Sequence, residues 1–237
     1  MRSGTNGARR IDLATVGVGL CVGLLLGWPL AVATGVGAST RNGALSSGGS
    51  LQEVRRIAAE VTVRISGEGC LGTTMGTGVR VGPGEVLTAA HVVAGESVAA
   101  VVDDDGTAGR GADITKLGAV DAATLHTTSS GRWVHRREGR ARIGETVVVA
   151  GSPGGGEVLV RTANVVGEVS GRVPGDPLTS LLLDVEAQPG DSGGPVLDLD
   201  GRLIGIVYAR SNADGRALVI PLDGVVFGAG RAGVACR

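Results

Sequence analysis

Short runs of Val, Leu and Ile recur from residue 61 onward, and each run is bounded by glycine, proline or aspartate. They cover residues 61–65, 77–81, 85–89, 97–102, 146–150, 180–185 and 202–208. Such runs between turn-forming residues are typical of β-strands, and no regular alternation of strands with longer helical patterns is visible. The sequence therefore predicts an all-β fold of barrels or sandwiches with closed strand edges.

A polar stretch without strand alternation, residues 127–142, divides these runs into two groups. We expect it to connect an N-terminal barrel, about residues 51–130, to a C-terminal barrel, about residues 143–237. Apolar residues at helical spacing in residues 51–60 predict a short helix before the first strand.

The N-terminal quarter of the chain has a different character. Residues 1–10 hold three arginines and no acid, and residues 13–36 contain no charged residue. Because this apolar segment can span a bilayer core of about 30 Å, we predict a single membrane anchor, with a cleaved signal segment as the alternative. The arginines place residues 1–12 in the cytoplasm. Residues 37–50, rich in Gly, Ser and Thr, are predicted to be a flexible linker.

Charge and composition exclude two classes of partner. The formal net charge is −1, and the only arginine-rich stretch, residues 132–142, is short. Nucleic-acid binding is therefore not expected. The three histidines are scattered, and no close Cys/His spacing is present, so no metal site or other cofactor is expected.

The stretch "QPGDSGGPVLD", residues 188–198, surrounds Ser192 with glycines and prolines. A tight turn between two strands could have this composition. A serine hydroxyl is a poor nucleophile by itself and needs an imidazole as base and a carboxylate to orient that base. Of the histidines, His91 follows an apolar strand pattern, whereas His126 and His135 lie in or beside the polar connector and are expected at the solvated surface.

The stretches "LTAAHVV" with His91, "VDAATL" with Asp121 and "GDSGGP" with Ser192, in this order, resemble the trypsin/chymotrypsin-like serine proteases, including their Deg/HtrA branch. The resemblance covers roughly residues 61–221. Within that branch, "GSPGGG" and the terminal "GVAC" are similar to actinobacterial membrane-anchored periplasmic proteases linked to acid resistance, which typically carry several membrane spans. The resemblance implies two six-stranded antiparallel β-barrels of the chymotrypsin type.

It also implies roles for single residues. Ser192 would attack the scissile carbonyl, His91 would act as base and then acid, and Asp121 would orient the imidazole. The backbone N–H groups of Gly190 and Ser192 would form the oxyanion hole. Asp191 is assigned a loop-stabilising role, because the chain has no "IVGG" start that could supply a pairing N-terminus.

Other aspartates also lie between His91 and the connector. Asp121 is preferred because it is followed by an apolar pattern expected of an acid at a buried strand edge, whereas the "DDDG" cluster is typical of a turn. The competing residues are Asp103, Asp104, Asp105 and Asp113.

A polypeptide substrate would pair with residues 207–211 as an added strand, contacting Tyr208, Ala209 and Arg210. Two residues are candidates for the pocket that binds the side chain before the cleaved bond. Glu186 stands where an acid in trypsins selects Lys or Arg, and Ala187 stands where the Deg/HtrA pattern places an apolar pocket.

Two cysteines lie outside the apolar segment that contains Cys21. In an oxidising compartment they can pair. The acid-resistance proteases join cysteines at matching ends of the domain, so the resemblance favours a disulfide between Cys70 and Cys236. Two free thiols are the alternative.

The sequence thus predicts a serine endopeptidase acting on envelope or extracellular proteins. It would be held at the cell membrane with its domain, residues 51–237, outside the cytoplasm, or secreted if the N-terminal segment is cleaved. The alternative is a catalytically inactive module of the same fold that binds peptides or proteins at the cell envelope.

Overall fold

The computed structural model describes residues 50–69, 72–170, 179–227 and 230–235. All of them belong to one compact unit, Leu45–Arg237. The expected membrane segment, residues 13–36, and the expected disulfide partners, Cys70 and Cys236, lie outside the described residues. Within the described ranges, no helix has both the length and the apolar character that crossing a membrane requires.

The first barrel is formed by the strands that precede the connector. These are β1 (Thr62–Gly69), β2 (Gly72–Gly82), β3 (Glu85–Thr88), β4 (Ala99–Asp103), β5 (Ala108–Leu117) and β6 (Ala123–Thr127). Neighbours pair antiparallel in the order β5-β4-β1-β2-β3-β6, and pairing of β5 with β6 closes the barrel. A 3-10 helix, η1 (Ala90–Val93), follows β3.

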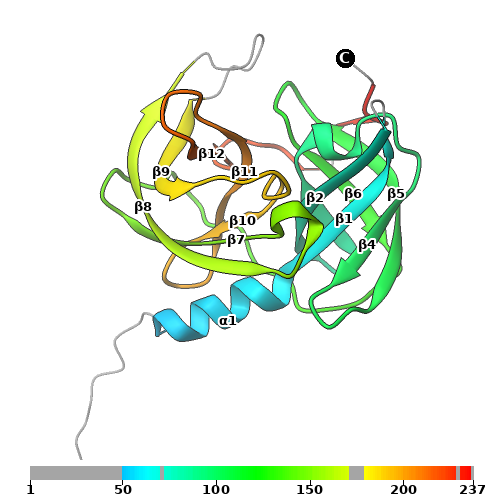
Figure 1. The fold of residues 1–237 in the computed structure, drawn as a ribbon, viewed down its shortest axis with the longest axis horizontal. Coiled ribbons are helices and arrows are strands. Elements are labelled where there is room, and N and C mark those ends of the chain that lie inside the picture. Colours follow the sequence, from blue (N-terminus) through cyan, green and yellow to red (C-terminus); the bar gives the residue numbers. More distant parts are fainter. Residues whose placement is uncertain (1–49, 70–71, 171–178, 228–229, 236–237) are drawn as a thin grey trace, which may run out of the picture. The chain divides into compact units, whose positions relative to one another are not determined.

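The second barrel follows the connector and closes in the order β10-β11-β12-β9-β8-β7. Its strands are β7 (Thr146–Gly151), β8 (Leu159–Val169), β9 (Ser180–Glu186), β10 (Pro195–Leu197), β11 (Leu203–Arg210) and β12 (Arg216–Pro221). A second 3-10 helix, η2 (Pro153–Gly155), links β7 to β8. Figure 1 shows both barrels, so the expected all-β, two-barrel architecture is confirmed.

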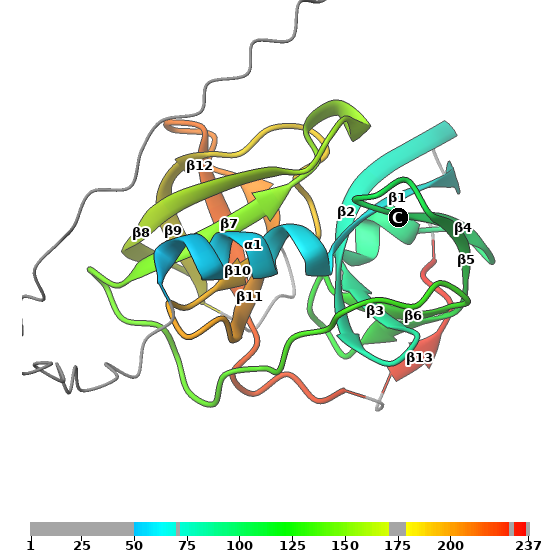
Figure 2. The ribbon, with the colours of Figure 1, turned by 90° about the horizontal axis from the view of Figure 1, so that it is seen from below.

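The predicted short helix is present as α1 (Leu51–Val61). Ser50 caps it by accepting a hydrogen bond from the Glu53 N–H at 3.2 Å, and one face buries Val54, Ala58 and Val61. This face packs against β7, β8 and β10, so α1 covers the second barrel although it precedes the first in the chain (Figure 2).

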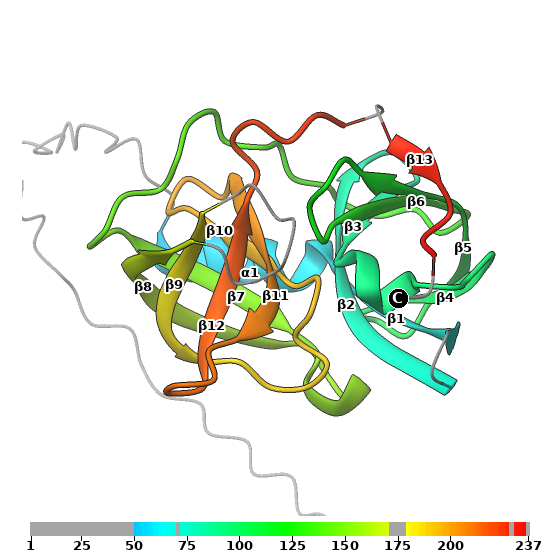
Figure 3. The same cartoon turned by 90° about the horizontal axis from the view of Figure 1, so that it is seen from above.

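The last described strand, β13 (Gly230–Ala232), follows the second barrel in the chain but belongs to the first. It pairs antiparallel with β5 of the first barrel (Figure 3). The expected ranges assigned residues 51–60 to the first barrel and residues 230–232 to the second. Helix packing places residues 51–60 on the second barrel, and strand pairing places residues 230–232 on the first.

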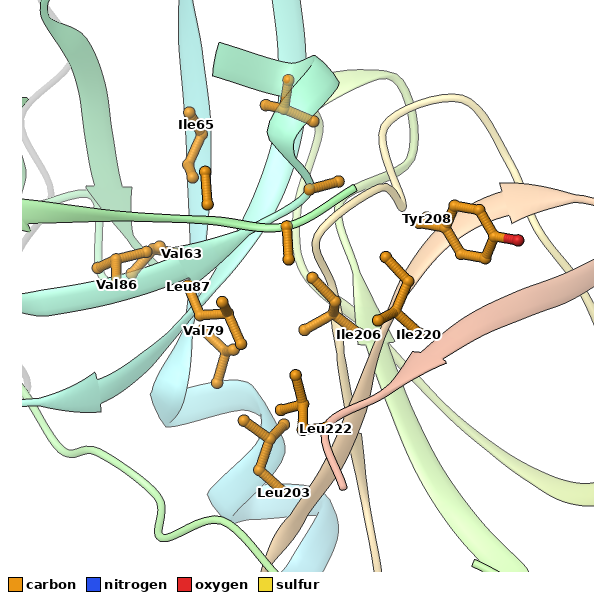
Figure 4. Packing of buried hydrophobic residues seen from close by; sticks show 14 of the residues in the cluster. Val63, Ile65, Val79, Val86, Leu87, Leu203, Ile206, Tyr208, Ile220 and Leu222 are labelled. Carbon is orange, nitrogen blue, oxygen red and sulfur yellow. The ribbon is translucent and has the colours of Figure 1, made fainter. Parts of the chain in front are cut away.

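A shared apolar core joins the barrels. Figure 4 shows side chains of the first barrel facing those of the second, including Val63, Ile65, Val79 and Leu87 on one side and Leu203, Ile206, Ile220 and Leu222 on the other. Fully burying one such aliphatic side chain contributes about 1.5–3 kcal/mol to stability. This core fixes the junction at which loops of the two barrels meet.

Candidate active site

His91 lies in η1, directly after β3, and its ring faces Asp121 in the turn between β5 and β6. His91 Nδ1 is 2.7 Å from Asp121 Oδ2, and the His91 backbone N–H donates to Asp121 Oδ1 at 3.0 Å. The Ala90 N–H donates to the Asp121 carbonyl at 3.1 Å. When Nδ1 carries the proton of the neutral ring, Nε2 is left as an acceptor, which is the tautomer that a general base requires.

The carboxylate of Asp121 stays ionised near neutral pH. Burial by itself would raise the pKa of Asp121, but hydrogen bonds from His91 and the charges of His91 and Lys116 outweigh it and lower the pKa. About half of the His91 side chain is exposed, at 48 %, against 23 % for Asp121. The ring is therefore held from one side and open on the other.

The competing aspartates have other partners or positions. Asp103 binds the buried guanidinium of Arg80, and Asp105 accepts the Thr107 N–H at 2.8 Å in the turn between β4 and β5. The "DDDG" cluster is thus a turn, as expected. Among the aspartates considered, only Asp121 bonds to His91 in the described part of the chain.

The other two histidines are exposed, as expected. His126 lies on β6, and His135 lies in the connector. Within the described ranges, no group of three or more His, Cys, Asp or Glu side chains is arranged to hold a metal ion.

Ser192 lies in the loop between β9 and β10, and both barrels hold its backbone. The Thr77 N–H of β2 donates to the Ser192 carbonyl at 2.8 Å, and the Gly193 N–H donates to the Val207 carbonyl of β11 at 2.6 Å. Gly193 has a φ of +90°, and a Cβ there would lie 1.9 Å from the Thr77 carbonyl oxygen. Only glycine permits this approach.

The same packing brings the serine loop to the histidine. A Cβ on Gly76 would lie 2.6 Å from the Val92 side chain and 3.1 Å from the Ser192 carbonyl oxygen. A Cβ on Gly193 would lie 3.0 Å from the backbone nitrogen of Ala89, two residues before His91. The backbones next to His91 and Ser192 therefore meet at Gly76 and Gly193.

Two backbone donors in the serine loop are unused. Within the described residues, neither the Gly190 N–H nor the Ser192 N–H donates a hydrogen bond. Gly190 has a φ of +99°, which suits glycine. Free N–H groups beside a serine hydroxyl can stabilise a negatively charged oxygen that forms during attack on a carbonyl.

Asp191 is 1 % exposed, and its charge is met by an arginine that sequence reasoning missed. Asp191 Oδ2 accepts from Arg161 Nη2 of β8 at 2.8 Å and from the Gln188 N–H at 2.9 Å. Arg161 Nη1 also donates to the Glu186 carbonyl at 2.8 Å. These contacts support the loop-stabilising role that was expected of Asp191.

The expected substrate-contacting residues differ in exposure. The Tyr208 side chain is 3 % exposed and belongs to the core, with its hydroxyl 2.7 Å from Ser180 Oγ (Figure 4). Its ring is therefore not available to a substrate, and only its backbone could contact a peptide. Ala209 is half-buried, and Arg210 is exposed.

The two candidates for the pocket residue also differ. Ala187 is buried, and its N–H donates to the Gly215 carbonyl at 3.0 Å. The Glu186 side chain is exposed and lies beside Gly215, as does Arg210. An acid at this position is therefore not buried at the base of a pocket.

The comparisons with known proteins agree with this architecture. The family described as trypsin-like peptidase domain matches residues 76–206, more than half of the chain. Serine protease Rv3671c of Mycobacterium tuberculosis is 31% identical over 182 residues, which cover 71% of this chain and 44% of that protein. A probable periplasmic serine endoprotease DegP-like of Halomonas elongata is 32% identical over 153 residues, 59% of this chain and 31% of that protein. The chain thus spans less than half the length of these relatives.

Solved structures show the same fold. The active form of the Rv3671c protease from M. tuberculosis has a TM-score of 0.66 at 26% identity, covering 77% of this chain and 86% of that chain. The HtrA-type protease AlgW with tripeptide has a TM-score of 0.64 at 23% identity, covering 72% and 59%, a likeness of fold.

Two antiparallel barrels that meet at a histidine–aspartate pair and a glycine-rich serine loop define the chymotrypsin-like class of serine peptidases. By its match over residues 76–206, the chain belongs to the trypsin-like peptidase domain family. The resemblance drawn from "LTAAHVV", "VDAATL" and "GDSGGP" is confirmed.

Proposed function

We propose that this chain is a serine endopeptidase that hydrolyses peptide bonds of envelope or extracellular proteins through Ser192, His91 and Asp121. The observation that carries the proposal is the His91–Asp121 pair, 2.7 Å apart, packed beside a serine loop with two unused N–H donors.

In the proposed reaction, Ser192 Oγ attacks the scissile carbonyl carbon while His91 Nε2 takes the hydroxyl proton. Asp121 stabilises the imidazolium that forms, and its lowered pKa keeps it anionic for this role. The N–H groups of Gly190 and Ser192 bind the oxyanion of the tetrahedral intermediate. His91 then protonates the leaving amine. In the second half, water attacks the acyl carbon while His91 takes its proton, and His91 returns this proton to Ser192 Oγ as the carboxylic acid product leaves.

The substrate would lie as an extended strand along the end of β11, bonded through the backbone of Tyr208, Ala209 and Arg210. Ala187, at the start of the serine loop, is packed in the core of the second barrel, and the Glu186 side chain next to it is exposed. Ala187 is therefore proposed to form the apolar wall behind the pocket for the residue before the cleaved bond. This predicts acceptance of apolar side chains in that pocket.

A location outside the cytoplasm is part of the proposal. It is supported by the apolar segment 13–36 and by the relative from Halomonas elongata, whose name places it in the periplasm. We propose a single membrane span, with residues 51–237 outside the cytoplasm.

The pairing of Cys70 with Cys236 is likewise proposed. A Cβ on Gly69 would lie 3.1 Å from the Ala94 carbonyl oxygen, and the Gly95 N–H donates to the Val234 carbonyl at 2.7 Å. The described residues beside both cysteines therefore meet the same segment, residues 94–95. Alkylation of the full chain without reductant, followed by intact mass, tests the pairing. One modification, at Cys21, is expected, and modification of all three cysteines would contradict the pairing.

The activity itself is tested by labelling the full chain in detergent with a fluorophosphonate probe and locating the adduct by mass spectrometry. We expect one adduct on Ser192, and none on the S192A variant, because only an activated serine reacts. A folded chain that does not label would favour the inactive peptide-binding module.

A further inference from the structure

Thr77 on β2 of the first barrel makes three hydrogen bonds to loops of the second. Its N–H donates to the Ser192 carbonyl at 2.8 Å, its Oγ1 donates to the Gly190 carbonyl at 2.6 Å, and the same Oγ1 accepts the Ser152 N–H at 2.9 Å. The residue is 0 % exposed. The hydroxyl thus joins the serine loop to the residue that precedes η2.

These bonds bear on the direction of the Gly190 N–H. That N–H belongs to the peptide joining Pro189 to Gly190, and in a trans peptide the C=O and N–H point in opposite directions. The Pro189 carbonyl accepts the Gly154 N–H of η2 at 2.7 Å, so the Gly190 N–H points away from η2. The Thr77 hydroxyl thus closes a ring in which hydrogen bonds join two short backbone segments, residues 189–190 and residues 152–154.

Gly190 has no side chain that could hold this arrangement. At a φ of +99° without a Cβ, the steric barrier to turning either adjoining peptide is small, so the hydrogen bonds set the orientation. A residue without the hydroxyl would leave the buried Ser152 N–H and the half-buried Gly190 carbonyl without this partner, and turning of a Gly190 peptide would relieve this.

We propose that Thr77 is a positioning residue whose hydroxyl holds the Gly190 N–H in the direction that stabilises the oxyanion. The first barrel then supplies the base and also sets the oxyanion hole of the second barrel. This inference rests on the proposed peptidase function.

The test compares T77V, T77S and wild type as full chains, with the rate and affinity of fluorophosphonate labelling measured separately. T77V removes the hydroxyl at nearly equal volume, so the maximal labelling rate should fall about 10²-fold or more while the probe affinity changes little. T77S keeps the hydroxyl and should label within a few-fold of wild type.

T62V is the matched control. Thr62 is also 0 % exposed, and its Oγ1 donates one buried hydrogen bond to the Ala58 carbonyl at 2.6 Å, at the end of α1. Thermal unfolding of all variants corrects the rates for the folded fraction. T62V should label like wild type once this correction is made.

A T77V rate equal to wild type per folded molecule would overturn the role of Thr77, as would a T77S rate as low as that of T77V. A wild-type chain that never labels at Ser192 would instead overturn the proposed function, so the two failures are distinguishable.

Discussion

His91 and Asp121 both belong to the first barrel and are joined by two direct hydrogen bonds, whereas Ser192 lies in a loop of the second barrel that distant residues hold in place. Thr77 binds this loop from the first barrel, and Arg161 binds it from β8. The proposed base is thus placed by neighbouring turns of one barrel, and the proposed nucleophile is placed by long-range contacts. Changes near His91 should affect chemistry far more than stability, whereas changes to the contacts that hold the loop should affect both.

The largest effect should come from removing either reacting side chain. H91A and S192A should each lower kcat about 10⁶-fold, since the two groups act as a unit and the double variant should be no worse than either. Peptidase assays on the full chain with a casein substrate measure this. If the fold-loss of kcat in the double variant equalled the product of the two single fold-losses, His91 and Ser192 would act independently.

D121N should lower kcat by about 10⁴-fold, because the amide favours the wrong imidazole tautomer. Asp105, an exposed turn residue, provides the control, and D105N should leave kcat unchanged. The same assay measures both variants. Greater damage from D105N than from D121N would mean that the acid has been assigned wrongly.

Arg161→Met should destabilise the fold by about 3–5 kcal/mol, because it leaves the Asp191 carboxylate buried without its partner. Urea unfolding measures the free energy, and Arg56→Met, at an exposed ion pair on α1, should change it far less. Adding Asp191→Asn to Arg161→Met should restore part of the loss. If the single variant were as stable as wild type, the serine loop would not depend on β8.

The smallest effect concerns pH. The pKa of Asp121 is lower in the folded chain than its ordinary value, so its ionised form stabilises the fold above about pH 5, and this contribution is lost as the pH falls through the folded pKa. The difference in unfolding free energy between wild type and D121N should therefore shrink as the pH falls below about 5. A difference that stays constant would contradict the lowered pKa.

The strands that sequence reasoning found contain runs of Val, Leu or Ile. Three short strands with buried apolar residues, β6, β10 and β12, were not among the predicted ranges. Two long strands, β5 and β8, were missed because most of their residues are exposed or half-buried and many are polar or glycine. His91, Asp121 and Ser192 were proposed as the catalytic residues from local motifs. Thr77 and Arg161 could not be identified in this way. Thr77 lies 113 positions from Gly190, and no motif around Thr77 indicates the contact.

Because α1 packs on the second barrel and β13 pairs with the first, neither α1 nor the first barrel can complete its packing until later parts of the chain have been made. As the polypeptide emerges from its N-terminus, the apolar face of α1 has no surface to cover until β7, β8 and β10 have been made. β5, near the middle of the chain, gains its last neighbour only with residues 230–232. A chain released or trimmed before these residues would leave residues 115–117 of β5 unpaired on one side, where another extended segment could bind.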